Sequence, residues 1–217
     1  MTDTHLPQMG IALDPSAMAP VLERECLHLP GEYELCDCGI GYVRYKPGRN
    51  CVICYELAIR DRKRHRVFRH LLCGNIYEHG SRVSAKRWRK AAGQFLIPVA
   101  IGWPLTHIPE LHMVVWAFPN DRRLSGLELL LDPHHLCTKV LSSLLPGEKI
   151  TDASSELVRY VPENRCTIRV IVQTDRRRTV LYAKTYAEDQ GEHIYQRLVA
   201  LSGCRASGLV VPRPLAS

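Results

Sequence analysis

The sequence predicts an α+β protein built as two tandem copies of one unit, which we place at residues 11–128 and 129–217. Each copy is expected to form an antiparallel meander sheet of about five strands, with one helix packed on it and one helix leading into it. Two observations predict this architecture. Short motifs recur in the same order in both halves, and each half alternates between strand-like and helix-like segments.

The recurring motifs are short but keep their order. A Leu-Asp-Pro motif at residues 13–15 returns at 131–133, and a Val-Arg-Tyr-x-Pro motif at 43–47 returns at 158–162. Each Leu-Asp-Pro precedes a helix-like stretch, and each Val-Arg-Tyr-x-Pro precedes a run of β-branched and apolar residues. Because the order is preserved along both halves, duplication explains the matches better than coincidence.

Each element of the unit has a local signal. Asp14 and Asp132 are expected helix N-caps, because each is followed by a proline that is favoured at the first helical position. Runs rich in β-branched and aromatic residues predict strands, and turn residues separate them. In the first copy we expect strands at 43–45, 51–59, 67–77, 96–98 and 113–118 and a helix at 82–92. In the second we expect strands at 157–160, 166–172, 179–186 and near Leu209, a helix at 192–201, and no last strand.

Composition limits the class of protein. The 217 residues are 46% hydrophobic and 24% charged, a balance typical of a folded chain, and no apolar run is long enough for a membrane span. Since no signal peptide is apparent, we expect a cytoplasmic protein. The net charge of +7 is concentrated in basic clusters at 60–66, 86–90 and 176–178, which either attract phosphate or form solvated turns and an exposed helix face.

The nine cysteines are interpreted as structural thiols, and disulfides are not expected. A zinc site is the alternative at Cys36-x-Cys38 and Cys51-x-x-Cys54. Both segments resemble strands, in which residues i and i+3 point to opposite faces, so Cys51 and Cys54 are unsuited to closing one tetrahedral site.

The order of three strands, a helix and two strands resembles the small lobe of aminoglycoside-phosphotransferase and choline-kinase-like proteins. The residues that carry this resemblance are the Arg-Tyr-x-Pro motifs at Arg44 and Arg159, the segment Tyr182-Ala183-Lys184-Thr185-Tyr186, the helix after Asp189, and Val210-Val211-Pro212. The resemblance covers most of both copies and implies a kinase-small-lobe-like fold, with ATP and magnesium as the ligands of the family, although the residues that hold magnesium in the family belong to its large lobe.

The resemblance also implies roles for three residues. Lys184 would hold the α- and β-phosphates of ATP, and Glu192 is the nearest carboxylate able to orient it. Tyr182 shares a strand face with Lys184 and would offer aromatic surface to the base. The alternatives are a solvated lysine on a strand and a carboxylate that caps the following helix.

The first copy departs from the family pattern. Asn75 stands at the lysine position and supplies no permanent charge, although the turn at 47–50 retains a glycine that allows a ligand to approach the backbone. The turn of the second copy contains Glu163 instead of glycine, and its carboxylate would repel phosphate. The lysine and the permissive turn thus lie in different copies.

These residues predict a truncated phosphotransferase-like protein that binds nucleotide at most partially. No His-x-Asp-x-x-x-x-Asn loop is present, so we expect no phosphoryl transfer by this chain alone. One alternative is a non-catalytic, pseudokinase-like scaffold that binds a protein partner at an exposed sheet edge. Another is a module that binds a phosphate backbone through its basic turns, although nucleic acid and membranes are not the expected partners. No catalytic residue and no metal ligand is assigned.

Overall fold

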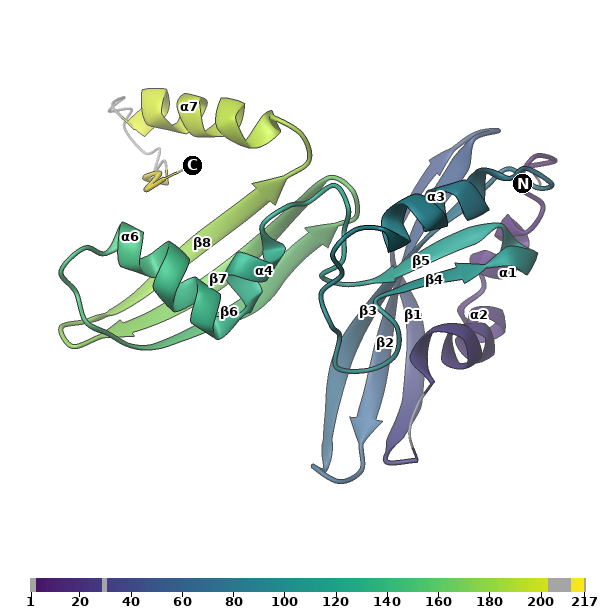
Figure 1. The fold of residues 1–217 in the computed structure, drawn as a ribbon, viewed down its shortest axis with the longest axis horizontal. Helices are drawn as coiled ribbons and strands as arrows, with labels where there is room; N and C mark the ends of the chain where they lie inside the picture. Colours follow the sequence, from purple (N-terminus) through teal and green to yellow (C-terminus); the bar gives the residue numbers. More distant parts are fainter. Residues whose placement is uncertain (1–2, 29–30, 203–211, 217) are drawn as a thin grey trace, which may run out of the picture. The chain divides into compact units, whose positions relative to one another are not determined.

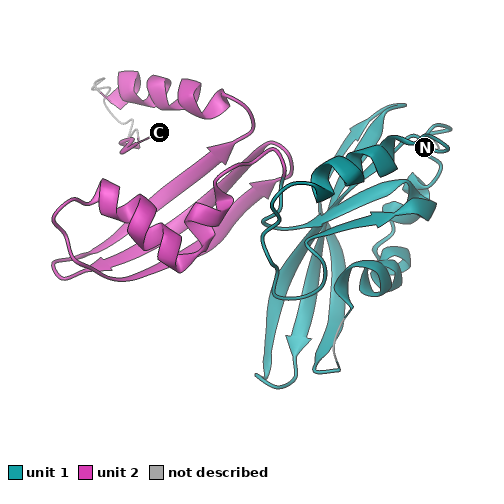
Figure 2. Cartoon of the chain, viewed as in Figure 1, with its two compact units in different colours: residues 1–121 teal, residues 122–217 magenta. Residues whose placement is uncertain are grey.

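The computed structural model describes residues 3–28, 31–202 and 212–216. The chain divides into two compact units, unit 1 with residues 1–121 and unit 2 with residues 122–217 (Figure 2). Each unit combines helices with an antiparallel sheet, which confirms the predicted α+β class. In the described part of the chain, no helix is both long and apolar enough to cross a membrane.

Unit 1 contains a five-stranded antiparallel sheet in the order β1-β2-β3-β5-β4 (Figure 1). Its strands are β1 (Tyr33–Lys46), β2 (Asn50–Asp61), β3 (Arg66–Tyr77), β4 (Leu105–Ile108) and β5 (Met113–Ala117). Its helices are α1 (Met9–Ala12), α2 (Pro15–Leu22), a π-helical turn (Glu23–Leu27), α3 (Val83–Ala92) and a 3₁₀ turn (Pro109–Leu111).

The alternation of side chains along β2 divides its residues between the two faces of this sheet. Ile53, Tyr55 and Leu57 are fully buried with the N-terminal helices in one apolar core. On the other face, Ser84 of α3 lies 3.1 Å from His107 of β4. The first unit therefore has a helical layer on each side of its sheet.

The predicted helix starts are confirmed. The Asp14 carboxylate accepts hydrogen bonds from the backbone N–H groups of Ser16 at 2.9 Å and Ala17 at 3.3 Å, and Pro15 opens α2. The Asp132 carboxylate accepts one from the N–H of His135 at 2.8 Å. Each carboxylate thus satisfies N–H groups that the helix itself leaves without partners.

Unit 2 has a three-stranded antiparallel sheet in the order β6-β7-β8 among its described residues. Its strands are β6 (Ile150–Val161), β7 (Arg165–Thr174) and β8 (Arg178–Tyr186). Its helices are α4 (Leu127–Leu131), α5 (Pro133–His135), a π-helical segment (Leu136–Leu141), α6 (Ser142–Leu144) and α7 (Gln190–Ser202). Alternate residues of β7 are buried, as the strand pattern predicts.

One predicted strand is wrong. Residues 96–98 form no strand, and the fourth strand of unit 1 is β4, at Leu105–Ile108. The Asn120 side chain explains the difference, because its Oδ1 accepts from the N–H of Ile97 at 2.7 Å and its Nδ2 donates to the Ile97 carbonyl at 3.0 Å. The polar backbone groups of Ile97 are thus satisfied without a neighbouring strand. The matching strand predicted near Leu209, and Val210 and Val211 of the family motif, lie outside the described residues.

Candidate functional site

Lys184 lies on β8, directly opposite Thr167 of β7. Its side chain is exposed, and it forms no ion pair with a described residue. Tyr182 and Val180 follow the same alternation, so they share this face of the strand, and they are 61% and 49% exposed. The structure therefore brings Lys184 and Tyr182 together on an open surface of the sheet.

Glu192 has a different local partner. It lies in the first turn of α7, and its Oε1 accepts a hydrogen bond from Nε2 of Gln196, one helical turn later, at 2.9 Å. No ion pair joins Glu192 to Lys184 in the part of the chain that the structure describes. At this position the carboxylate also interacts favourably with the positive end of the helix dipole.

Asn75, at the expected lysine position of unit 1, is buried on β3, where its Oδ1 accepts a hydrogen bond from Nδ2 of Asn50 at 2.9 Å. Both side chains are neutral. The two amides satisfy part of each other's hydrogen-bonding capacity, so this position of unit 1 has a structural contact and no cation for a phosphate.

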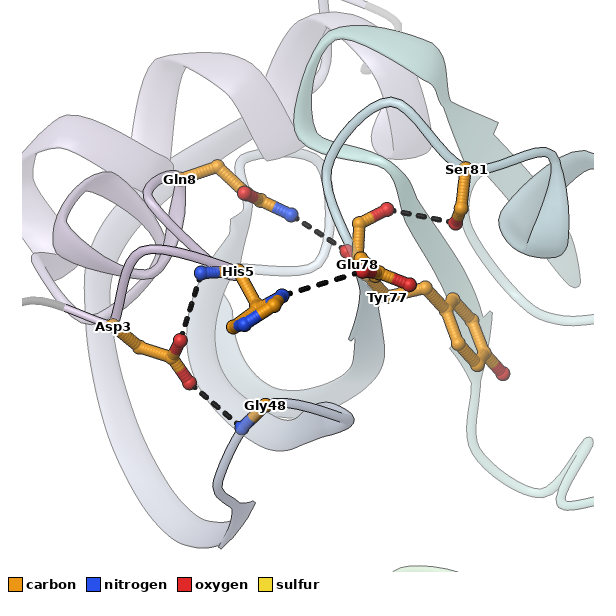
Figure 3. A network of polar contacts seen from close by, with 7 residues as sticks. All are labelled: Asp3, His5, Gln8, Gly48, Tyr77, Glu78 and Ser81. Atoms are coloured by element: carbon orange, nitrogen blue, oxygen red, sulfur yellow. Dashed lines mark hydrogen bonds and ion pairs between the residues drawn. The ribbon is translucent and has the colours of Figure 1, made fainter.

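The first hairpin turn of unit 1 is held by the N-terminal segment (Figure 3). The Asp3 carboxylate accepts hydrogen bonds from the backbone N–H of Gly48 at 2.9 Å and from the Tyr45 hydroxyl at 2.7 Å. Gly48 has a φ of 63°, a left-handed conformation that glycine adopts without strain. An anionic group from the chain itself therefore lies at the permissive turn.

The same segment also reaches the end of β3. Nδ1 of His5 lies 3.3 Å from the Glu78 carboxylate, and Gln8 donates a 2.8 Å hydrogen bond from Nε2 to the carbonyl of Tyr77 (Figure 3). We call these contacts, together with those of Asp3, the N-terminal clasp. The clasp joins the first hairpin turn to the end of the third strand.

Hydrogen bonds shift the ionisation of this clasp. The Tyr45 hydroxyl, followed by the N–H groups of Gly48 and His5, lowers the pKa of Asp3 from 3.8 to about 2. The same contact with Asp3 raises the pKa of Tyr45. Asp3 is therefore a carboxylate throughout the neutral range, and Tyr45 keeps its proton as the donor.

Unit 2 has equivalent contacts with other residue types. Arg122 donates to the Glu163 carboxylate in the β6–β7 turn, from Nη2 at 3.0 Å and from Nε at 3.3 Å. The next residue, Arg123, pairs with Glu188 just after β8. Glu163 is only 5% exposed, so its charge is balanced by a guanidinium and does not face solvent as an isolated anion.

The basic β2–β3 hairpin is paired with carboxylates. Glu34 accepts from Arg60 at 3.0 Å and from Arg62 at 3.3 Å, and both contacts lower its pKa. Asp61, which is 2% exposed, lies 3.5 Å from Arg64 and 3.9 Å from Arg66. An open depression of about 610 Å³ lies between these side chains. Glu34 of β1 and Asp61 together offset two of the five Lys and Arg charges at residues 60–66, so this hairpin keeps a net positive charge.

The two third strands differ at their outer edges. In unit 1, β3 pairs with β2 on one side and with β5 on the other, from Leu72 opposite Ala117 to Ile76 opposite Met113. In unit 2, β8 pairs with β7 alone among the described residues. An edge strand presents unpaired N–H and C=O groups, so the open edge of β8 lies beside the exposed face of Tyr182 and Lys184.

Comparison of the chain with protein-family models, with curated proteins and with solved structures finds no match. Among the described residues, no group of histidine, cysteine, aspartate and glutamate side chains is arranged to hold a metal ion.

Proposed function

We propose that the chain is a non-catalytic binding protein made of two kinase-small-lobe-like repeats, and that unit 2 accepts an extended segment of a protein partner at β8. The observation that carries this proposal is that β8 pairs with β7 alone among the described residues, beside the exposed side chains of Val180 and Tyr182. The proposal rests on the resemblance of both repeats to the small lobe of aminoglycoside-phosphotransferase-like proteins. It includes no phosphoryl transfer by this chain alone.

The local contacts of both units support the repeat. In each, a leading helix, three antiparallel strands and a further helix follow one another in the same order. In each, the segment before the leading helix contacts the first hairpin turn, through Asp3 or Arg122, and a carboxylate one or two residues beyond the third strand, through His5 or Arg123. A shared contact pattern made with different residue types fits divergence after duplication.

Unit 1 indicates what kind of segment would fit the edge of β8. The strand that pairs with β3 is β5, with the sequence Met-Val-Val-Trp-Ala, and each of its side chains is buried. Backbone hydrogen bonds would provide affinity, and the apolar side chains would provide contact area on both faces. We therefore expect the partner of β8 to be an extended, apolar segment of four to six residues, about the length of an ordinary strand.

A strand peptide tests this proposal. The probe carries the sequence of Met113–Ala117 between flanking lysines. The control peptide has proline in place of Val115, because proline has no backbone N–H to donate to a strand ladder. The full-length chain is isotope-labelled, and amide shifts and exchange rates are recorded by NMR. We expect the first peptide to shift and protect the amides of β8, and the control peptide to do neither.

Matched variants locate the binding. Tyr182→Asp places a charge on the open face of β8 and should weaken peptide binding at least tenfold. Val43→Asp alters an exposed valine of β1 in the same way and should leave binding unchanged. Equal binding of both peptides, or protection of β1 in place of β8, would contradict the proposal.

A second candidate function is nucleotide binding at Lys184, with magnesium and ATP as the implied ligands. It is supported by an exposed ammonium group with no ion pair to a described residue, next to the aromatic ring of Tyr182. Lys184 would contact phosphate oxygens and Tyr182 would pack against the base. We assign Glu192 only a minor role in orienting Lys184, because its carboxylate accepts a hydrogen bond from Gln196.

We also propose a cytoplasmic location. The support is that every described cysteine is a free thiol, as expected in a reducing compartment.

A further inference from the structure

Two cysteines lie directly opposite each other in the middle of the unit 1 sheet. Cys54 of β2 and Cys73 of β3 are register partners, and their Sγ atoms are 2.6 Å apart. Cys51, only three residues from Cys54, lies opposite Ile76 and belongs to the apolar core on the other face. The sheet therefore pairs Cys54 with Cys73 and separates both from Cys51.

The strand geometry allows a covalent bond between this pair. Residues directly opposite in an antiparallel ladder have Cα atoms about 4.5 to 5.5 Å apart. This lies within the Cα separation of about 4.4 to 6.8 Å that disulfides span. A bond between Cys54 and Cys73 would thus need little movement of β2 or β3.

The pair lies on the face of the sheet that carries α3. Cys73 is opposite Trp116 of β5, and the alternation of β3 places it on the same face as Asn75. Asn75 is opposite Val114, which is opposite His107, and His107 contacts Ser84 of α3. Cys54 is 5% exposed and Cys73 is fully buried, so an oxidant can reach the two thiols only when the structure around them opens locally.

The helix on this face is weakly anchored. Only Ser84 and Ala91 of α3 are buried, its Lys and Arg residues are exposed, and the half-buried Trp88 stacks on His107. A helix with so little buried apolar surface is expected to open more readily than the sheet beneath it. This opening gives a soluble oxidant a route to the two thiols.

We propose that Cys54 and Cys73 form a reversible redox pair, oxidised to a disulfide by a small disulfide such as glutathione disulfide. One thiolate attacks the oxidant and displaces one glutathione, giving a mixed disulfide. The second thiolate attacks the protein sulfur of that mixed disulfide and releases the other glutathione. The two cysteines lose two protons and two electrons in total, and the oxidant becomes two molecules of reduced glutathione.

Peptide mapping tests this proposal in the full-length, folded protein. The protein is treated with glutathione disulfide, the remaining thiols are alkylated, and the chain is cleaved by trypsin. We expect a linked pair of peptides, residues 50–60 joined to residues 70–82, that dithiothreitol separates. Fragmentation between positions 51 and 54 should assign the bond to Cys54. Because access is through local opening, the link should form more slowly than the exposed Cys36 reacts.

Single substitutions provide matched controls. Cys51→Ser should retain the linked peptides, whereas Cys54→Ser and Cys73→Ser should abolish them. In the wild-type protein the oxidised form should melt several degrees higher than the reduced form, because a disulfide lowers the conformational entropy of the unfolded chain. If Cys54 and Cys73 remain fully alkylatable after Cys36 has reacted completely, or if fragmentation assigns the bond to Cys51, the proposal is wrong. The wild-type result decides even if a serine variant fails to fold.

Discussion

The carboxylate of Asp3 accepts a 2.9 Å hydrogen bond from the backbone N–H of Gly48, which joins the N-terminal segment to the β1–β2 turn. In unit 2, Arg122 makes the equivalent connection to Glu163 in the β6–β7 turn. A carboxylate bonded to a backbone amide in one unit thus corresponds to a guanidinium bonded to a carboxylate in the other. The position of the contact agrees in the two units, whereas the residue types differ.

The Asp3 contact predicts a pH-dependent contribution to stability. Its pKa in the folded protein is about 2, below the ordinary value of 3.8, so the contribution is complete above the ordinary pKa and is lost as pH falls toward 2. Asp3→Asn removes the charge at every pH. We expect wild type to melt above the variant at pH 6 and the two melting temperatures to converge near pH 2. A difference that stays constant over this range would exclude the carboxylate as its source.

Nucleotide binding at Lys184 predicts a ligand-dependent melting temperature. Magnesium and ATP at about 100 times the dissociation constant should stabilise wild type by about 2.7 kcal/mol. Lys184→Ala should lose most of this gain, and Lys139→Ala, which alters another exposed lysine of unit 2, should retain it. Thermal shift with and without ligand checks all three proteins. An equal shift in Lys184→Ala would show that this ammonium does not hold the phosphates.

Gly102 should be less tolerant of a side chain than Gly80. Both have left-handed backbones, with φ of 74° and 73°, so alanine at either should cost about 1 to 2 kcal/mol in strain. At Gly102 the added Cβ would also lie 2.2 Å from the carbonyl oxygen of Cys26, whereas Gly80 has open space. We expect Gly102→Ala to lose about 1 to 3 kcal/mol more. Denaturant unfolding measures both variants, and similar losses would contradict the close approach.

The Tyr55 hydroxyl links the sheet to the N-terminal helices. It is fully buried and donates a 2.7 Å hydrogen bond to the Ala12 carbonyl, and burial raises its pKa far above the ordinary value. Tyr55→Phe leaves this carbonyl without that donor and should lower the free energy of unfolding by about 1 to 2 kcal/mol. Tyr33→Phe is the control, because the Tyr33 hydroxyl has no hydrogen-bond partner among the described residues. A Tyr55→Phe effect no larger than the control would show that the bond contributes little.

The features that the sequence predicts well are those with local causes. Asp14 and Asp132 start helices because a carboxylate followed by proline suits the first turn wherever it occurs. The meander strands follow from runs of β-branched and aromatic residues separated by turns. Strand β1 is longer than predicted and begins at Tyr33. Its first residues alternate little between apolar and polar side chains, so the sequence gives little strand signal there, but they pair with β2.

The features that the sequence does not reveal depend on distant partners. Residues 96–98 form no strand because the Asn120 side chain hydrogen-bonds the backbone N–H and carbonyl of Ile97. Asn120 lies 23 residues further along the chain. No sequence motif predicts the N-terminal clasp, because Asp3 and His5 are ordinary polar residues near the start of the chain and their partners are distant in sequence. The pairing of Cys54 with Cys73 needs the register of β2 and β3, which the spacing of cysteines does not give.

Amide hydrogen exchange in the free chain tests the open edge of β8 most directly. Neighbouring amides along an antiparallel strand point to alternate sides, so a strand with one partner protects only every second amide. We expect alternating fast and slow exchange along Arg178–Tyr186, and uniform protection along residues 72–76 of β3, which are paired on both sides. Uniform protection along β8, equal to that of β3, would contradict the proposed binding edge.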